Sequence, residues 1–385
     1  MNSPAVTTAP VADNAHRSST LQAPLPARVL VVGPLPPPNG GMALQTEALV
    51  RCLRSEGLQV EVVANNAPYQ PAWIASVPGL RAGFRLLPYL LRLWRGSGRN
   101  DLVHVLGNSG WAWYLFAAPA LHIAHWRGRP VLLNYRGGLA EAFFATAWPR
   151  VQKTLRITDV LAVPTEFLQE VFGARGQRAE IVPNILDNSL FKPAANPVSQ
   201  LHIVVTRNLE ALYDNASALQ AFALVKSEIH DARLTLAGEG PERESLQQLA
   251  QALGIADAVR FAGRLPREQV AGLLQSARIV LNPSTADNSP NSLIEAMAAG
   301  VPIVSTLVGG VPQLCRPDQE ALLVPARAPE QMAAALLRLH RDEDLRQRLI
   351  HAGQQRAAEF SWTSVWPRLQ QCYRAAISQR SLRHA

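Results

Sequence analysis

Residues 279–306, with the sequence IVLNPSTADNSPNSLIEAMAAGVPIVST, combine two carboxylates with a polar loop. Asp287 lies in the loop, and Glu295 follows eight residues later, in the second turn of a predicted helix. Free backbone amides at a helix N-terminus bind anions, and the helix dipole favours negative charge there. Carboxylates on either side of such a site can accept hydrogen bonds from hydroxyl groups. This combination suits a ligand with hydroxyls on both sides of a pyrophosphate, as in a nucleotide sugar.

The elements that position these groups are a strand, a polar loop, a short helix and a second strand, which together form a βαβ unit. We expect Ser289 to cap the helix, with Pro290 at its first position and Gly300 at its end. The amides of Asn291 and Ser292 would then face the carboxyl end of a strand, where open α/β sheets bind ligands. The alternative is that these are ordinary helix-start and helix-stop residues without a ligand.

Three other junctions between an apolar run and a polar loop carry residues that can meet an anion or a sugar. RVLVVG, residues 28–33, leads into a loop with Gly40 and Gly41, and adjacent glycines allow a backbone to approach a ligand closely. Arg136 follows the apolar run that ends at residue 135, and Arg207 follows another. The simpler explanations are a chain turn at the glycines and structural or surface arginines.

Residues 279–306 resemble the donor-site signature of glycosyltransferase family 4, the retaining GT-B enzymes. In that signature an acid, seven residues and a Glu precede an Ala-rich helix, a Gly and a strand, and Asp287 stands where the family more often has Glu. The resemblance covers nearly all of residues 27–375, including the Val-Pro-Asn-x-x-Asp-x-x-x-Phe pattern of residues 182–191. It implies an α/β fold of the GT-B type, with two Rossmann-like domains facing across a cleft.

The resemblance also implies a set of site residues. The catalytic group would comprise Asp287, which orients the sugar, Arg207, which opposes the charge of the departing diphosphate, and Arg136. Gly40 and Gly41 would border the sugar, and Glu295 would bind the ribose hydroxyls. The complete set of substrate-binding residues that it implies is Gly40, Gly41, Glu239, Gly240, Arg264, Leu265, Asn288, Ser289, Asn291, Ser292, Leu293 and Glu295.

The sequence departs from the family pattern at two places. Many relatives carry a His beside the reacting sugar, where this chain has Tyr135 and Arg136. Relatives also carry a Lys five residues after the Arg that matches Arg207, and here that position is Leu212. Arg136 is expected to bind a phosphate or an acidic acceptor, and either Arg136 or Arg264 is expected to compensate for the missing second cation.

Length and composition predict two globular domains. A chain of 385 residues exceeds one ordinary core, and 48% hydrophobic residues suffice for two. We expect a disordered tail in residues 1–26, an acceptor domain in 27–190, a nucleotide-sugar donor domain in 191–360, and a helix in 361–385 that crosses back to the first domain. The tail lacks an apolar stretch flanked by basic residues, so it does not resemble a secretory signal, and a cytoplasmic location is expected.

The net charge of +8 favours anionic partners, which include nucleic acid, lipid and phosphorylated substrates. No basic-aromatic platform or reading helix indicates nucleic acid. Residues 71–99 hold five arginines and no acid among apolar residues, and we expect an amphipathic segment broken at Pro88. It either lies on an anionic bilayer, at the inner face of the cytoplasmic membrane, or is an ordinary helix pair with a solvated face.

Together these features predict a retaining glycosyltransferase that moves a sugar from a nucleoside diphosphate sugar to an acceptor hydroxyl. The acceptor is expected to be lipid-linked or an oligosaccharide, in surface polysaccharide or glycolipid assembly. The sequence has no His or Cys cluster with metal-ligand spacing, so neither a metal nor a cofactor besides the sugar donor is expected. The alternatives are a protein that binds a nucleotide sugar or polyanion without turnover, and a sugar-nucleotide epimerase on the same fold.

Overall fold

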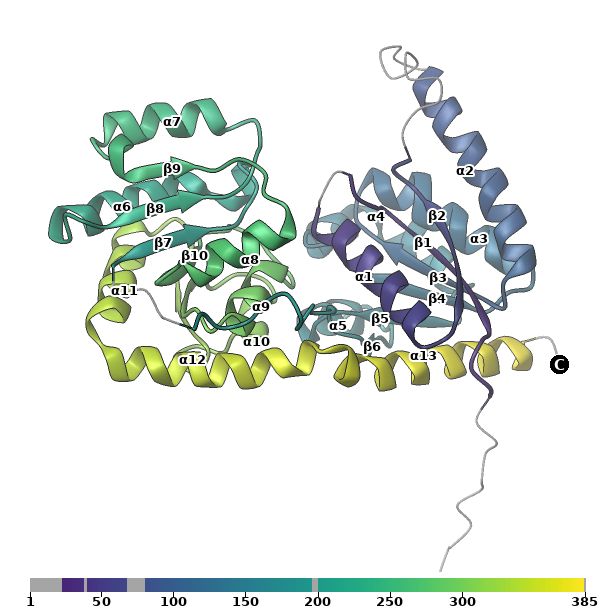
Figure 1. The fold of residues 1–385 in the computed structure, drawn as a ribbon. Helices are drawn as coiled ribbons and strands as arrows, with labels where there is room; N and C mark the ends of the chain where they lie inside the picture. Colours follow the sequence, from purple (N-terminus) through teal and green to yellow (C-terminus); the bar gives the residue numbers. More distant parts are fainter. Residues whose placement is uncertain (1–22, 38–39, 68–79, 196–199, 384–385) are drawn as a thin grey trace, which may run out of the picture.

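The computed structural model describes residues 23–37, 40–67, 80–195 and 200–383. Most of the segment expected to be a disordered tail, and the first part of the segment 71–99, therefore lie outside the described residues. The chain forms two α/β domains side by side, joined by the linker after residue 181 and by two long helices at the C-terminus (Figure 1).

The first domain is built on a six-stranded parallel sheet with the strand order β2-β1-β3-β4-β5-β6. Val29 and Val31 of the first strand pack on one side of this sheet, while Leu30 and Val32 pack on the other. Both faces are therefore buried, which explains why its strands read as nearly continuous apolar runs. The strands are β1 (Arg28–Gly33), β2 (Gln59–Ala64), β3 (Leu102–Gly107), β4 (Val131–Tyr135), β5 (Val160–Val163) and β6 (Glu180–Ile181). The helices are α1 (Gly41–Ser55), α2 (Leu80–Arg99), a π-helical turn (Trp113–Ala117), α3 (Ala118–Trp126), α4 (Ala140–Leu155) and α5 (Glu166–Gly173).

The second domain repeats this plan with the order β12-β11-β10-β7-β8-β9, again all parallel. Two parallel Rossmann-like sheets confirm the predicted fold class. The strands are β7 (His202–Val205), β8 (Arg233–Leu236), β9 (Val259–Phe261), β10 (Ile279–Asn282), β11 (Ile303–Thr306) and β12 (Ala321–Val324). The helices are α6 (Asn215–Glu228), α7 (Arg243–Ala252), α8 (Arg267–Gln275), α9 (Asn291–Ala298), α10 (Val311–Leu314), α11 (Pro329–Arg341), α12 (Glu343–Ala357) and α13 (Trp362–Leu382).

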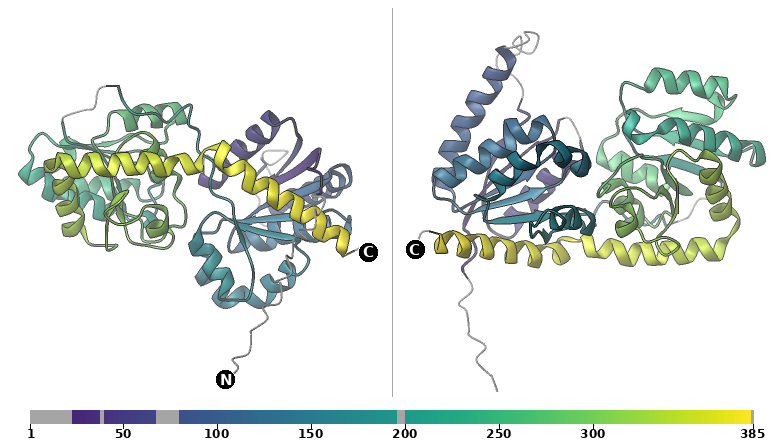
Figure 2. Two further views of the ribbon diagram at one scale, coloured as in Figure 1. Left: turned by 90° about the horizontal axis from the view of Figure 1, so that it is seen from below. Right: turned by 180° about the vertical axis from the view of Figure 1, so that it is seen from behind.

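Helices α12 and α13 run in succession along one side of both domains (Figures 1 and 2). Trp366 and Tyr373 of α13 are buried in the core of the first domain, beneath the sheet. The Tyr373 hydroxyl is hydrogen bonded to Nδ1 of His104 at 3.0 Å, and Trp362 Nε1 donates to Glu56 at 2.8 Å. The C-terminal helix therefore fastens the second domain to the first.

The expected break at Pro88 is wrong, because α2 is one helix from Leu80 to Arg99 with Pro88 inside it. Proline removes one helical hydrogen bond, which leaves a carbonyl one turn earlier to find another partner. Phe84, one turn earlier, and Leu87 are about half exposed or more, at 49% and 62%. Water can reach this side of the helix, so the loss is tolerated without a break.

Candidate active site

The loop between β10 and α9 forms the centre of the candidate site. Helix α9 begins at Asn291, and Pro290 rather than Ser289 is its N-cap. The expected Ser289 cap is wrong: its hydroxyl is buried without a hydrogen-bond partner among the described residues. The first amide of the helix to donate is that of Leu293, to the Pro290 carbonyl at 3.1 Å. The amides of Asn291 and Ser292 precede the helical hydrogen bonds, as a phosphate site requires.

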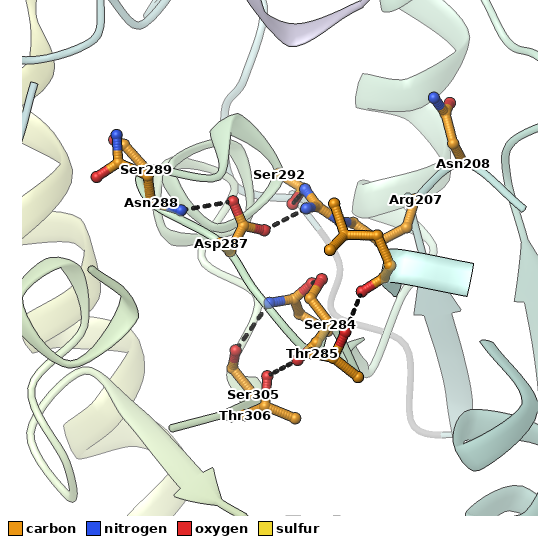
Figure 3. Close-up of polar contacts among 12 residues, drawn as sticks. Arg207, Asn208, Ser284, Thr285, Asp287, Asn288, Ser289, Ser292, Ser305 and Thr306 are labelled. Carbon is orange, nitrogen blue, oxygen red and sulfur yellow. Dashed lines mark hydrogen bonds and ion pairs between the residues drawn. The ribbon is translucent and has the colours of Figure 1, made fainter. Parts of the chain in front are cut away.

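Asp287 and Arg207 form a buried ion pair beside this helix start (Figure 3). Arg207 Nη2 contacts Asp287 Oδ2, and Nη1 donates to the Ser292 hydroxyl at 3.2 Å. The guanidinium also lies 4.3 Å from the centre of the Tyr213 ring. Burial raises the pKa of Asp287, and the charge of Arg207 opposes that rise. The pair thus fixes both side chains at the head of α9.

Glu295 and Arg267 form a second pair, with 3.8 Å between Oε1 and Nη2. Their side chains are 14% and 20% exposed, so the pair is largely withdrawn from water. Burial raises the pKa of Glu295 to about 7, against the opposing charges of Arg267 and Arg207. This carboxylate therefore changes charge near neutral pH.

A nucleotide sugar, the ligand that the family resemblance implies, is expected to bind more tightly as the pH rises from 6 to 8. The raised pKa means that Glu295 holds its proton to about pH 7, and only the carboxylate accepts hydrogen bonds with both oxygens. The diphosphate of a nucleotide sugar is esterified at both ends and does not titrate in this range. Glu295→Gln should weaken binding at pH 8 by about tenfold and flatten the profile. Calorimetric titration at several pH values measures the affinity. If the affinity of the variant still rises with pH as steeply as that of the wild type, the pH dependence belongs to another group.

The first domain reaches the same site through hydrogen bonds with Asn291. Its side-chain amide donates to the Gly41 carbonyl at 3.2 Å, and its Oδ1 accepts from Gln45 at 3.2 Å and from Asn184 at 2.8 Å. Asn184 also donates to the Ser289 carbonyl at 2.9 Å. The glycine loop at the head of α1 and the start of α9 are thereby held together across the domain boundary.

A cavity of about 800 Å³ lies between the domains and is lined by both. Its wall includes residues that directly follow strands of the two sheets, such as Asn108 after β3, Arg136 after β4 and Thr206 after β7. Its charged lining residues are four arginines and two carboxylates: Arg136, Arg207, Arg264, Arg267, Asp287 and Glu295. This excess of positive charge suits a ligand of two negative charges.

The structure brings most of the expected residues to this cavity but leaves three away from its wall. Gly40, Gly41, Arg264, Leu265, Asn288, Ser289, Asn291 and Ser292 line it, together with the charged residues named above. Glu239 is exposed to solvent, and Gly240 packs against the Leu209 carbonyl, so neither residue lines the cavity. The neighbouring Gly238 lines it instead. Leu293 is fully buried in the core of the second domain, so that its side chain supports α9.

Arg267, Asn184 and Gln45 have roles that the sequence analysis did not assign. Arg267 is the first residue of α8, where a positive charge is unfavourable because of the helix dipole. This unfavourable position could have indicated from the sequence that Arg267 has a role in the site. Asn184 lies in the linker pattern of residues 182–191. Nothing in the local sequence indicates a role for Gln45, because its hydrogen-bond partners Ile185 and Asn291 lie 140 and 246 residues away in the chain.

No three His, Cys, Asp or Glu side chains gather to hold a metal in the described part of the chain. An Asp-x-Asp motif was not expected from the sequence, but the chain contains one at the start of α12, Asp342-Glu343-Asp344. Asp342 caps that helix by accepting from the Leu345 amide at 2.9 Å, and none of the three residues lines the large cavity.

Comparison with known proteins places this geometry in a family. Residues 39–190 match Glycosyltransferase Family 4, and residues 189–356 match Glycosyl transferases group 1. The two matches adjoin and together span both domains. The chain belongs to the GT-B glycosyltransferases of family 4, as the resemblance predicted.

Individual relatives are distant. The chain is 29% identical over 262 residues to MMP alpha-(1->4)-mannosyltransferase of Mycolicibacterium hassiacum, which covers 66% of this chain and about three-fifths, 61%, of that protein. It is 25% identical to D-inositol 3-phosphate glycosyltransferase of Thermobispora bispora, over 88% of this chain and 91% of that protein. HepE of Anabaena in complex with UDP-glucose has a similar fold, with a TM-score of 0.66 at 16% identity, over 88% of this chain and 96% of that one.

Proposed function

We propose that the protein transfers a sugar from a nucleoside diphosphate sugar to an acceptor hydroxyl and retains the anomeric configuration. The observation that carries this proposal is the cavity between the domains, where the free amides of α9 and four arginines face two carboxylates. HepE, which shares the fold, binds UDP-glucose, and the two relatives named above are glycosyltransferases. Assembly of a surface polysaccharide or glycolipid is the role we propose for this reaction.

In this reaction the diphosphate gathers negative charge as the bond to the sugar breaks. Arg207 and the amides of Asn291 and Ser292 are fixed beforehand, so they oppose that charge without having to reorganise. Glu295 would bind the ribose hydroxyls, and Asp287, held by Arg207 and by the Asn288 amide at 3.0 Å, would orient the sugar. No protein-held metal takes part in this scheme.

The test is to incubate the protein with a panel of nucleotide sugars and a lipid extract, and to identify the products by mass spectrometry and NMR. A glycosylated acceptor with the anomeric configuration of the donor is expected. Unchanged ligand would favour a binding protein, and an epimerised donor would favour an epimerase. Transfer should continue in excess EDTA; a loss that magnesium or manganese restores would overturn the metal-independent scheme.

We further propose that α2 brings the enzyme to an anionic membrane, where a lipid-linked acceptor would lie. Phe84, Leu87, Leu91 and Trp94 recur every three or four residues along α2, and each is 46% exposed or more. The helix projects from the body of the first domain (Figure 1). Its sequence contains arginines and no acid, so the exposed apolar stripe lies on a purely cationic helix. None of the helices in the described residues has the length and hydropathy that spanning a bilayer requires.

Replacing Arg92, Arg95 and Arg99 by Gln should lower binding to anionic liposomes by about a hundredfold. Each basic residue near an anionic surface contributes about 1 kcal/mol, and the attraction is screened within roughly 8 Å at physiological salt. Sedimentation with liposomes measures this, and donor binding should not change. The matched control replaces three exposed arginines on other helices, Arg150, Arg348 and Arg368, by Gln. If both variants lost liposome binding equally, the net charge of the protein would account for the binding, and α2 would have no special role.

A further inference from the structure

Arg136 carries a positive charge into the cavity, and no carboxylate of the described chain forms an ion pair with it. Its Nη1 donates to Asn184 Oδ1 at 2.5 Å, while its Nε is buried without a hydrogen-bond partner among the residues that the structure describes. Burial lowers its pKa to about 10, so it remains charged at neutral pH. A buried charge without an opposite charge is costly unless a ligand supplies one.

The other arginines of the cavity differ from Arg136 in this respect. Arg207 is paired with Asp287, and Arg267 is paired with Glu295. Arg264 is exposed to water, which screens its charge. Among the described cavity arginines, Arg136 is therefore the one that is partly buried and has no ion pair.

The backbone around Arg136 is held rigidly. Its amide donates to the Gly107 carbonyl at 2.9 Å, and the buried Tyr135 is hydrogen bonded to the Ser109 hydroxyl at 2.6 Å. A Cβ on residue 137 would lie 2.3 Å from the hydroxyl oxygen of Ser109, in the loop after β3. Only a glycine therefore allows the two loops to approach this closely. The hydrogen bond to Asn184 then holds the guanidinium on this backbone before any ligand arrives, which lowers the entropic cost of binding.

The position of Arg136 relative to α9 indicates what part of a ligand it would meet. Asn184 accepts from Arg136 and donates both to Asn291 and to the Ser289 carbonyl, at the head of α9. One side chain therefore separates Arg136 from the proposed diphosphate site. Beyond the guanidinium, Asn108, Ser109 and Phe143 of the first domain line the cavity. This is where a sugar attached to the diphosphate, or the acceptor facing it, would lie.

We propose that Arg136 binds a carboxylate or phosphate group carried by the transferred sugar or by the acceptor, so that one of the two substrates is acidic beyond the diphosphate itself. The inference rests on the proposed function, because it places a sugar donor in this cavity. Arginine binds both groups through charge-assisted hydrogen bonds. Arg136 lines the cavity and uses Nη1 for Asn184, so that within the described chain Nη2 remains to donate to such a group.

The donor arm of the test compares UDP, UDP-glucose and UDP-glucuronate by calorimetry, or the GDP and GDP-sugar equivalents if the protein binds GDP. If the donor sugar is acidic, the wild-type protein should bind the uronate at least about tenfold more tightly than the neutral sugar. Arg136→Met should remove that preference and leave binding of the bare diphosphate unchanged. Arg136→Lys should keep part of the preference, and Arg150→Met, at an exposed arginine of the same domain, is the matched control.

The acceptor arm uses the protein saturated with the nucleoside diphosphate and measures binding of glucose, glucuronate and glucose 6-phosphate. A preference for the acidic sugars that Arg136→Met abolishes would place the anion on the acceptor. Thermal unfolding controls for folding, and the midpoint of Arg136→Met should change little, because loss of the hydrogen bond to Asn184 is offset by removal of a partly buried charge that has no ion pair. An equal loss of bare diphosphate binding in Arg136→Met would assign this arginine to the diphosphate and overturn the inference.

The inference and the proposed function fail in different ways. A wild-type protein that binds no nucleotide would overturn the proposed function, and the inference with it. Nucleotide binding without an acidic preference in either arm would overturn the inference alone.

Discussion

Replacing Arg207 by Met should slow sugar transfer by roughly a hundredfold to a thousandfold, the range seen when one fixed donor to a developing negative charge is removed. Arg207 contacts Asp287 and the Ser292 hydroxyl at the head of α9, where the leaving diphosphate would gather charge. The loss should appear mainly in kcat, because the interaction strengthens as the bond to the sugar breaks. Steady-state kinetics with a saturating donor measure it.

A second variant separates this effect from loss of folding. Arg207→Met alone leaves Asp287, whose side chain is 13% exposed, without its partner, and breaking a buried pair costs about 3 to 5 kcal/mol. The double variant with Arg207→Met and Asp287→Asn should recover most of the free energy of unfolding, because no buried charge remains unpaired. It should not recover transfer. A double variant that was both stable and fully active would show that the ion pair is structural only.

Replacing Gly309 by Ala should reduce transfer by about a hundredfold, since displacing a reacting group by about 1 Å can have that effect. Gly309 lies in the turn after β11 with a φ of +49°, a conformation that side chains rarely adopt. An added Cβ would lie 2.0 Å from the Asp287 carbonyl oxygen, so the loop carrying Asp287 would have to move. Asp287 would then lose its alignment with Arg207.

The matched control is Gly272→Ala, in the exposed face of α8. A Cβ there meets no atom within 4 Å, so the helix should gain about 0.5 to 1 kcal/mol of stability and transfer should not change. Kinetics and thermal unfolding are measured for both variants. Wild-type transfer in Gly309→Ala would mean that the position of Asp287 is not critical to the reaction.

The order of strands and helices could be predicted well from the sequence, because it depends on apolar runs and on the spacing of polar residues close together in the chain. Apolar runs such as residues 28–33 are buried on both faces of a parallel sheet, and the acid at 287 with the Glu at 295 falls on one loop and the helix that follows. These patterns depend on residues within a few turns of each other. The fold class and the family are confirmed, and the site residues of the β10–α9 loop line the cavity with the exception of Leu293.

The expectations that the structure does not match were drawn from local sequence patterns or from the family resemblance, and contacts with distant parts of the chain or with solvent changed the outcome. Pro88 was expected to break a helix, but it lies on the exposed side of α2, where water replaces the lost partner. Glu239 was expected near the nucleotide because of the family resemblance, yet it is exposed to solvent and does not line the cavity. Ser289 was expected to cap α9, but the helix begins one residue later.

The sequence by itself determined two domains, the βαβ unit of residues 279–306 and the two acids within it, because hydrophobic period, helix signals and spacing act over short stretches of chain. The family resemblance added the Rossmann-like fold of both domains. Only the tertiary structure decided which cations are neutralised. Arg267 meets Glu295, and Arg207 meets Asp287 across 80 residues, whereas Arg136 meets the Asn184 amide and no acid in the described chain. Pairing of charges across a cavity depends on how separate elements pack, and no local pattern records it.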